Sequence, residues 1–306
     1  MAMVVLAWSA SCAANTIEIA PGADLAAQLH ALHAGDTLIL DDGSYLVNGA
    51  VSVTFAGTSA APIVVRAKDG AHPVVDQVSN QNILDIVDST FVTLDGITFV
   101  HGSRGLRFTG GSDITVQNCV VHDTPYNAIA ANDIGYDYAR LRFIHNEIYN
   151  TGGTAEGFYL GCNDDGCRVH DSLIANNDIH DLNGPTVSQG DGIEIKKGSY
   201  ANIVRDNVIH DTGYPGITIY DVNGRGAVNI IERNLVWNTG DNGIQVTADA
   251  IVRNNIVLSE GAAASAFASN ALQNGSAANL TIVNNTFFAA QGDGIHLNSV
   301  SGSVRI

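Results

Sequence analysis

The chain has 306 residues, enough for one large domain or two ordinary ones, and its 14 basic and 31 acidic side chains give a formal net charge of −17. A chain this acidic repels polyanions, so we do not expect nucleic acid or an anionic membrane surface as a direct partner. With 45% hydrophobic and 15% charged residues the chain should form a substantial core. No apolar run approaches the roughly 18 residues of a membrane-spanning helix.

Residues 1–14 read MAMVVLAWSASCAA, an apolar stretch followed by small residues. This is typical of the end of a secretory signal, although the positively charged start of such a signal is missing. We predict a signal-peptide remnant over residues 1–14 and a single domain over residues 15–306, in a secreted or periplasmic protein. The alternative is that residues 1–14 are an N-terminal tail of the mature fold.

A pattern recurs along the chain from Ile114 onward: a β-rich run, an Asn, an apolar pair, a polar pair and, in most copies, a Gly. The spacings between the marker residues are 28, 31, 30, 27, 21 and 30, for Asn118, Asn146, Asn177, Asn207, Asn234, Asn255 and Asn285. A period in this range indicates stacked coils. An Asn at the same turn of each coil can hydrogen-bond its neighbours in a ladder, which satisfies backbone groups that stacking would otherwise leave unpaired.

Short strands accompany these markers, most of them introduced by Gly. Apolar and other residues alternate in them, which is the periodicity of a strand and not of a helix. They are GLRFTG from Gly105, NAIAAN from Asn127, EGFYLG from Glu156, DGIEIK from Asp191, PGITIY from Pro215, NGIQVT from Asn242 and DGIHLN from Asp293. Each coil is therefore predicted to consist of several short strands joined by turns.

These repeats, with the opening TIEIAPGADLAAQLHALHAGDTLILDDGSYLV, resemble the right-handed parallel β-helix proteins of the pectate-lyase-like superfamily. The resemblance covers nearly the whole chain from Thr16. It implies an all-β fold, a right-handed parallel β-helix, with a short N-terminal capping helix over Ala23–His33 before the first coil. It does not fix the activity, because such helices host lyases, hydrolases, epimerases and non-catalytic proteins.

Alignment of the strands by their first inward apolar residue predicts which residues face outward. One outward column is Arg107, Ala130, Tyr159, Glu194, Thr218, Gln245 and His296. Lys196 and Tyr220 lie two positions further along their strands. Because neighbouring coils are about 4.8 Å apart, an acid, an amine and two phenols are expected in one patch, where they could transfer protons.

Lys196 and Lys197 are two of only three lysines in the chain. In the resembling lyases, nearest to the chondroitinase B and alginate lyase type, a Lys near an acidic strand abstracts the proton α to a uronate carboxylate. The resemblance implies Lys196 as this base, or Lys197 if the strand's parity shifts at the turn, with Tyr220 or Tyr159 protonating the leaving oxygen. Those lyases usually carry an Arg one coil further on. Here Tyr220 stands at that place and Arg225 follows in the next loop.

Calcium has candidate ligands in the same region. Glu156, Asp191 and Asp293 precede equivalent strands, and Glu194 projects beside them. Carboxylates that converge from stacked coils suit Ca²⁺, which prefers oxygen ligands. We predict a calcium site at Glu156, Asp191 and Glu194. The alternative is that Asp-Gly before a strand is turn chemistry, which is favoured for Asp293.

Three His-Asp pairs fall at equivalent turns, and their repetition favours a structural stack over a catalytic role. They are His122-Asp123, His180-Asp181 and His210-Asp211. The alternative is a wall of sugar subsites, in which His210 beside the lysine-bearing coil could contribute acid/base chemistry. A serine hydrolase is not indicated, because no Gly-x-Ser-x-Gly elbow supplies a nucleophile.

Cys162 and Cys167 flank a short turn. Their spacing suits a loop-closing disulfide in an oxidising compartment better than a zinc site, for which further ligands are missing.

We therefore expect a secreted, monomeric polysaccharide lyase that cleaves a uronate-containing acidic glycan by β-elimination. The alternatives on the same fold are a C5-epimerase, a glycoside hydrolase and a non-catalytic carbohydrate-binding β-helix.

Overall fold

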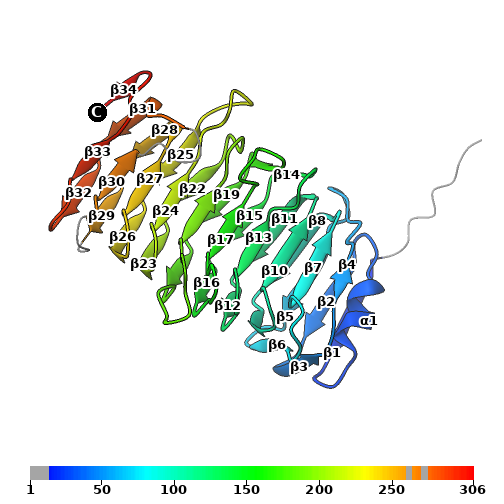
Figure 1. Ribbon diagram of the computed structural model, residues 1–306. Coiled ribbons are helices and arrows are strands. Elements are labelled where there is room, and N and C mark those ends of the chain that lie inside the picture. The colour runs from blue at the N-terminus through cyan, green and yellow to red at the C-terminus, as the bar shows by residue number, and fades with distance from the viewer. Residues whose placement is uncertain (1–13, 260–263, 270–274) are drawn as a thin grey trace, which may run out of the picture.

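A computed structural model describes residues 14–259, 264–269 and 275–306. The predicted signal remnant lies, apart from Ala14, outside the described residues. The chain winds into an elongated stack of coils with the helix α1 (Leu25–His30) over its N-terminal end, as Figure 1 shows. This confirms the predicted all-β parallel β-helix with its short helix, which spans fewer residues than the expected Ala23–His33. No helix in the described ranges is long and apolar enough to cross a membrane.

Three sheets run along the stack, and neighbouring strands within each are parallel. The 14-stranded sheet contains β1 (Thr16–Ile19), β2 (Thr37–Leu40), β5 (Ile63–Ala67), β8 (Thr90–Asp95), β11 (Ser112–Gln117), β14 (Asp137–Ala139), β15 (Arg142–Ile144), β18 (Arg168–His170), β19 (Leu173–Ala175), β22 (Ile203–Arg205), β25 (Asn229–Glu232), β28 (Ala248–Arg253), β31 (Ala278–Val283) and β34 (Val304–Arg305).

The other two sheets have ten strands each. One contains β3 (Gly43–Val47), β6 (Pro73–Gln77), β9 (Thr98–His101), β12 (Val120–His122), β16 (Glu147–Tyr149), β20 (Asp178–His180), β23 (Val208–Thr212), β26 (Leu235–Thr239), β29 (Ile256–Ser259) and β32 (Thr286–Ala289). The sheet that positions the site contains β4 (Ser52–Val53), β7 (Leu84–Val87), β10 (Leu106–Thr109), β13 (Ile129–Ala131), β17 (Phe158–Leu160), β21 (Ile193–Ile195), β24 (Ile217–Ile219), β27 (Ile244–Val246), β30 (Phe267–Ser269) and β33 (Ile295–Leu297).

The core is the interior of the coils, filled by aligned apolar columns. In the site-bearing sheet the first inward residues are in register and fully buried from Leu106 to Phe267, as the alternation predicts. One strand was missed in the sequence, because β30 reads only FAS. It places Ala268 between Gln245 and His296, so these two are not neighbours in the outward column.

Glycines before the strands allow the coils to pack closely. A Cβ at Gly192 would lie 2.5 Å from the Gly216 carbonyl oxygen and 2.6 Å from a methyl carbon of Ile209. Real Cβ atoms do not approach other atoms so closely, so a larger residue would push neighbouring coils apart. The Asp-Gly before β21 therefore owes its glycine to coil packing.

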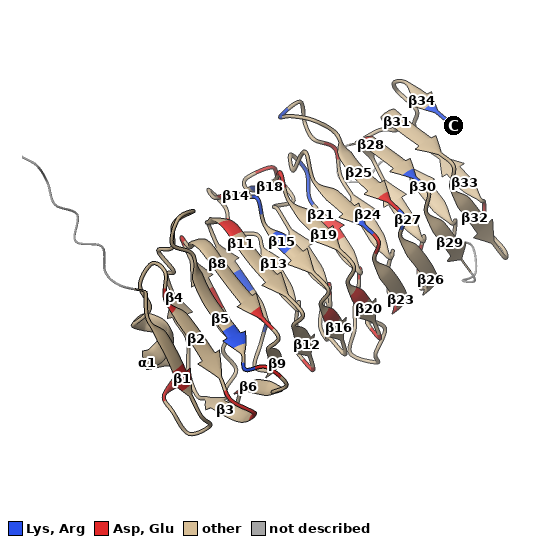
Figure 2. Ribbon diagram, turned by 180° about the vertical axis from the view of Figure 1, so that it is seen from behind, with Lys and Arg blue, Asp and Glu red and all other residues tan. Residues whose placement is uncertain are grey.

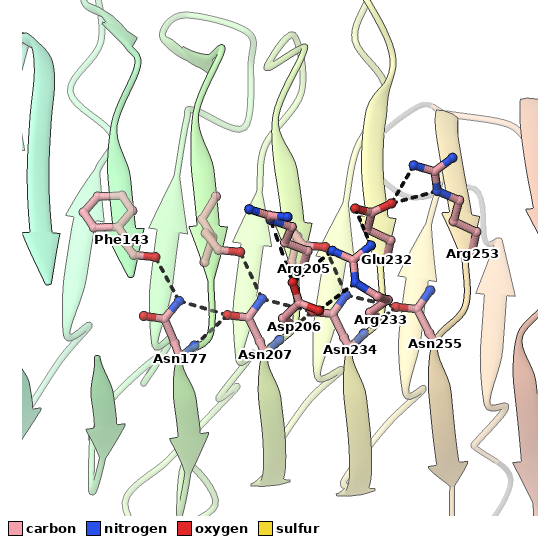
Figure 3. A network of polar contacts seen from close by, with 12 residues as sticks. Phe143, Asn177, Arg205, Asp206, Asn207, Glu232, Arg233, Asn234, Arg253 and Asn255 are labelled. Atoms are coloured by element: carbon pink, nitrogen blue, oxygen red, sulfur yellow. Dashed lines mark hydrogen bonds and ion pairs between the residues drawn. The ribbon is translucent and has the colours of Figure 1, made fainter. Parts of the chain in front are cut away.

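The predicted asparagine ladder runs through six consecutive coils and is shown in part in Figure 3. Asn207 Oδ1 accepts from the backbone N (3.0 Å) and the Nδ2 (2.9 Å) of Asn177. Asn207 Nδ2 donates to the Ile174 carbonyl (3.0 Å) and to Asn234 Oδ1 (2.9 Å). Both halves of each interior amide are thus satisfied within the protein. The ladder residues are Asn146, Asn177, Asn207, Asn234, Asn255 and Asn285.

Asn118 is not part of this ladder, contrary to the marker alignment. Cys119 occupies the ladder position, and its backbone N donates to Asn146 Oδ1 at 3.0 Å. Asn118 stands one residue earlier with φ +53°, and its amide bonds Asp95 at 2.7 Å. The Asn at this place serves a left-handed turn, for which Asn is one of the favoured residue types.

The His-Asp repeats form the predicted structural stack. The rings of His122, Tyr149, His180, His210 and Trp237 lie in one row, with centroids 4.2–5.2 Å apart and planes within 11° of parallel. Each His donates from Nδ1 to a carboxylate oxygen of the following Asp, for example His210 to Asp211 at 2.6 Å. Asp211 has φ +53°, the conformation of a left-handed turn. The repeated pair is therefore explained by two structural roles, the Asp in the turn and the His in the ring stack.

We predict that Asn207→Ala lowers the free energy of unfolding by about 2–4 kcal/mol, because it leaves the Asn177 amide groups and the Ile174 carbonyl buried without partners. Urea denaturation measures this change. The matched control is Asn118→Gly, at an exposed Asn of the equivalent turn of another coil where glycine tolerates the positive φ, and we expect a loss of less than about 1 kcal/mol. Equal losses in the two variants would show that the ladder contributes nothing specific.

Candidate active site

The predicted outward column of the site-bearing sheet is present in the expected register. Tyr159 on β17 pairs with Glu194 on β21, which pairs with Thr218 on β24, which pairs with Gln245 on β27. These residues contribute to a cleft of about 290 Å³ across the outer face of the sheet. Its lining is Tyr159, Asn163, Gln189, Asp191, Glu194, Lys196, Tyr214, Pro215, Thr218, Tyr220, Asp241 and Gln245.

Lys196 lies at the floor of this cleft, directly after β21. Its Nζ forms an ion pair with Glu194 Oε1 and lies 4.7 Å from the ring centre of Tyr159 and 4.9 Å from that of Tyr220. Only 4% of the Lys196 surface is exposed. Two aromatic rings and a carboxylate therefore hold this amine in one place, with electrostatic attraction from both rings.

Both tyrosines are held in the neutral form. Burial raises the pKa of Tyr159 and of Tyr220, and the negative charge of Glu194 raises each further. The Tyr220 hydroxyl lies 3.4 Å from Glu194 Oε1, and the Tyr159 hydroxyl donates to Asn163 Oδ1 at 3.1 Å. At neutral pH each phenol can therefore donate a proton into the cleft.

Three carboxyl groups meet beneath Lys196, and we call Glu156, Asp191 and Glu194 the acidic triad. One ligand oxygen from each lies within 4.8 Å of the others. Glu156 and Asp191 each precede their strand by two residues, so the pairing of β17 with β21 stacks them one above the other. Glu156 is fully buried, and Asp191 and Glu194 are 4% and 5% exposed.

The negative charge of the acidic triad is only partly compensated by protein groups. Asn127 Nδ2 donates to Glu156, and the Thr218 hydroxyl donates to Asp191 Oδ1 at 2.6 Å. Burial raises the pKa of Asp191 well above its ordinary value, and the Glu194 charge adds to this. Burial also raises the pKa of Glu194, against the attraction of Lys196.

Two oxygens of the acidic triad, Glu156 Oε1 and Glu194 Oε2, are buried with no hydrogen-bond partner. Buried polar atoms are almost always paired, so these two point to a missing partner. A hard divalent cation fits, because Ca²⁺ is held by carboxylate oxygens and would neutralise three negative groups at once. The residues predicted as calcium ligands are therefore brought together in a form that could hold a metal ion.

Several cleft residues were not among the sequence-predicted candidates: Asn163, Gln189, Tyr214 and Asp241. They come from loops that precede or follow the strands, where strand alternation gives no signal. Asn163 lies inside the loop that the predicted Cys162–Cys167 disulfide closes, and this bond is present. The disulfide thus fixes the short loop whose Asn163 accepts from the Tyr159 hydroxyl.

Three predicted catalytic candidates do not line the cleft. The charge of Lys197 instead acts on Asp221, where it opposes the rise in the pKa that burial causes. Arg225 forms an ion pair with Asp165 at 2.6 Å. His210 stands in the ring stack of the other ten-stranded sheet.

We predict that the Asp191 contribution to the stability of the metal-free protein is lost as the pH rises above about 4, the ordinary pKa of an Asp. Because the folded-state pKa of Asp191 is raised, its contribution is full below that pH and is lost as the pH rises through the folded pKa. Added Ca²⁺ should restore the stability at neutral pH. Thermal unfolding with chelator and with Ca²⁺ measures both effects.

Asp191→Asn should raise the unfolding temperature in chelator at neutral pH by about 2–4 °C, the shift caused by roughly 1 kcal/mol in a chain of moderate size. It should also remove the response to Ca²⁺. The control is Asp293→Asn, because Asp293 precedes β33 in the equivalent place but is exposed. A Ca²⁺ response unchanged by Asp191→Asn would refute the site.

Similar solved structures cover most of the chain. An alginate lyase from Paenibacillus sp. str. FPU-7 superposes with a TM-score of 0.74 at 18% identity, over 95% of this chain and 99% of that one. XylC in complex with xylose gives a TM-score of 0.65 at 12% identity, over 91% and 70%. The pectate lyase Pel9A gives 0.52 at 15% identity, over 88% and 78%. At these identities the likeness shows the fold alone.

No curated protein matches the sequence. The model of the right-handed β-helix region matches residues 74–257 and 174–306, which together make up most of the chain. The resemblance to pectate-lyase-like β-helix proteins is thus confirmed for the fold, and polysaccharide lyases are among the similar structures. The chain belongs to the right-handed β-helix family.

Proposed function

We propose that this protein is a polysaccharide lyase that cleaves a uronate-containing glycan by β-elimination at the Lys196 cleft. The observation that carries the proposal is the contact of the Lys196 amine with the rings of both Tyr159 and Tyr220 on the floor of an open cleft. An immobilised amine and two neutral phenols are a proton acceptor and proton donors at one place. The similarity to an alginate lyase fold is consistent with this activity.

The base is Lys196 in its neutral form. The ammonium reaches this form by losing one proton to the open cleft that it lines, which leaves Glu194 ionised. The neutral amine then takes the proton from C5 of the uronate. The C5 electron pair forms the C4=C5 double bond, and the C4–O bond to the leaving sugar breaks.

The acid is a tyrosine. Tyr220 or Tyr159 donates its hydroxyl proton to the departing oxygen, because the raised pKa of each phenol keeps that proton in place at neutral pH. The product is one chain end with an unsaturated uronate and one new hydroxyl end. The proton taken from C5 remains on Lys196 and is then lost to solvent, while the tyrosine regains its proton from solvent.

A divalent cation on Glu156, Asp191 and Glu194 would supply charge neutralisation for the cleft and for a uronate carboxylate bound in it. The three carboxyls themselves do not suit a glycoside hydrolase. Hydrolases place two carboxyls on either side of the scissile bond of the sugar, whereas these three converge in one buried cluster.

Export is part of the proposal, in line with the predicted secreted or periplasmic location. The Cys162–Cys167 disulfide supports it, because such bonds persist in oxidising compartments.

We predict that Lys196→Ala lowers kcat on a uronate polymer about 10³-fold and Tyr220→Phe about 10²-fold, the range that a lost general base or acid costs. The assay follows the ultraviolet absorbance of the unsaturated uronate on alginate, pectate and glycosaminoglycans. Lys197→Ala should retain most of the activity, since this side chain does not line the cleft. Loss at Lys197 and not at Lys196 would reassign the base.

Other products would identify the alternatives. New reducing ends without unsaturation would indicate a hydrolase, and inverted C5 centres in an uncleaved polymer would indicate an epimerase. Binding without any chemical change across the panel would favour a carbohydrate-binding β-helix.

A further inference from the structure

A second groove lies on the outer face of the 14-stranded sheet and shares no lining residue with the Lys196 cleft. It consists of two adjoining hollows of about 400 and 330 Å³ that have Arg142, Asp171 and Leu173 in common. We call it the arginine groove. Figure 2 shows the strands of this sheet with basic and acidic segments along them.

The floor of the arginine groove follows from the strand register. Arg142 on β15, Leu173 on β19 and Ile203 on β22 form one outward column over three coils. Arg205 stands two residues further along its strand than Ile203, so Arg142 and Arg205 bracket an apolar centre. Two coils separate them, a distance of roughly 10 Å along the stack.

Most charged groups at the arginine groove are already paired with each other. Asp113 accepts two hydrogen bonds of 2.7 Å from Arg140. Glu232 is held by Arg233 at 2.9 Å and by Arg253 at 2.6 Å, as Figure 3 shows. Asp171 accepts a hydrogen bond from His170 Nδ1 through one oxygen at 2.7 Å.

Two guanidinium groups make no hydrogen bond to an acidic residue that the structure describes. Arg142 is exposed and has no hydrogen bond or ion pair to any residue that the structure describes. Arg205 forms a long ion pair with Asp206, at 3.8 Å, and stands in register with Glu232. Both oxygens of Asp206 are already bonded by Arg233, at 2.7 and 3.0 Å. The Arg205 Nε is moreover buried without a hydrogen-bond partner.

This face also differs from the rest of the molecule in charge. The groove residues and their ion-pair partners include five of the chain's 14 basic side chains but only four of its 31 acidic ones. A local excess of positive charge in a chain of net charge −17 attracts an anion to this place and not to others.

We propose that the arginine groove binds a carboxylate-bearing glycan as a second, non-catalytic site; the identity of the glycan rests on the proposed function. Guanidinium groups recognise carboxylates through paired hydrogen bonds. The spacing of Arg142 and Arg205 lets two carboxylates of one extended chain bind at once, while Leu173 and Ile203 contact the apolar faces of the sugar between them. A polymer held here stays near the cleft, which raises its effective concentration there.

The test is calorimetric titration of a Lys196→Met chain, which does not cleave, with size-fractionated oligomannuronate and oligogalacturonate. Substituting both groove arginines, Arg142→Gln with Arg205→Gln, should weaken binding about tenfold or more, because two charge-assisted contacts are lost. The matched control is Arg305→Gln. Arg305 belongs to the same outward column of the sheet, but on β34 and outside the groove. Circular dichroism confirms that each variant is folded.

Binding that is unchanged in the double arginine variant, or equally weakened in the Arg305 variant, would overturn the second site. So would equally tight binding of an uncharged cello-oligosaccharide. The lyase assay is run separately on the chain with Lys196 intact. Arginine-dependent binding without elimination would refute the proposed activity alone, and elimination without arginine-dependent binding would refute the groove alone.

Discussion

The structure depends on parallel backbone pairing between successive coils, which places equivalent residues of each coil in line at about 4.8 Å. The side chain at each position of a coil must therefore be compatible with the side chain at the same position of the next coil. Amides and aromatic rings tolerate it well, since an Asn amide both donates and accepts and flat rings stack. Carboxylates do not, and for this reason the stacking of Glu156 over Asp191 is the most demanding feature of the fold.

The other residues of the candidate active site partly compensate the negative charge that this stacking brings together. Lys196 neutralises part of the negative charge of the acidic triad and is itself held between two rings. The same charge keeps Tyr159 and Tyr220 protonated. The two orphaned oxygens, Glu156 Oε1 and Glu194 Oε2, leave room for a cation. The amine, the two phenols and the three carboxyls are thus one electrostatic unit, and a change in any one should alter the others.

The other faces of the solenoid use their side chains differently. In the row that contains His210 the ring faces cover one another, so they stabilise the stack and offer no flat surface to a sugar. On the outer face of the 14-stranded sheet, most charged side chains near the arginine groove form ion pairs with each other. Arg142 and Arg205 make no hydrogen bond to an acidic residue that the structure describes. The two proposed binding sites for an acidic glycan, the Lys196 cleft and the arginine groove, therefore lie on different faces of the solenoid.

Sequence reasoning predicted the solenoid, the disulfide, the Asn ladder and the outward register of Tyr159, Glu194, Thr218 and Gln245, because these depend on local alternation and on a repeat visible along the chain. Which charged residues meet could not be predicted in this way, because it depends on the folded path of each turn and loop. Lys196 entered the cleft while Lys197 and Arg225 stayed out of it, because one residue of parity or a loop path directs each side chain. The short strand FAS and the position of Cys119 in the ladder were not predicted from the sequence for a similar reason. Both are defined by stacking against neighbouring coils and not by their own residue types.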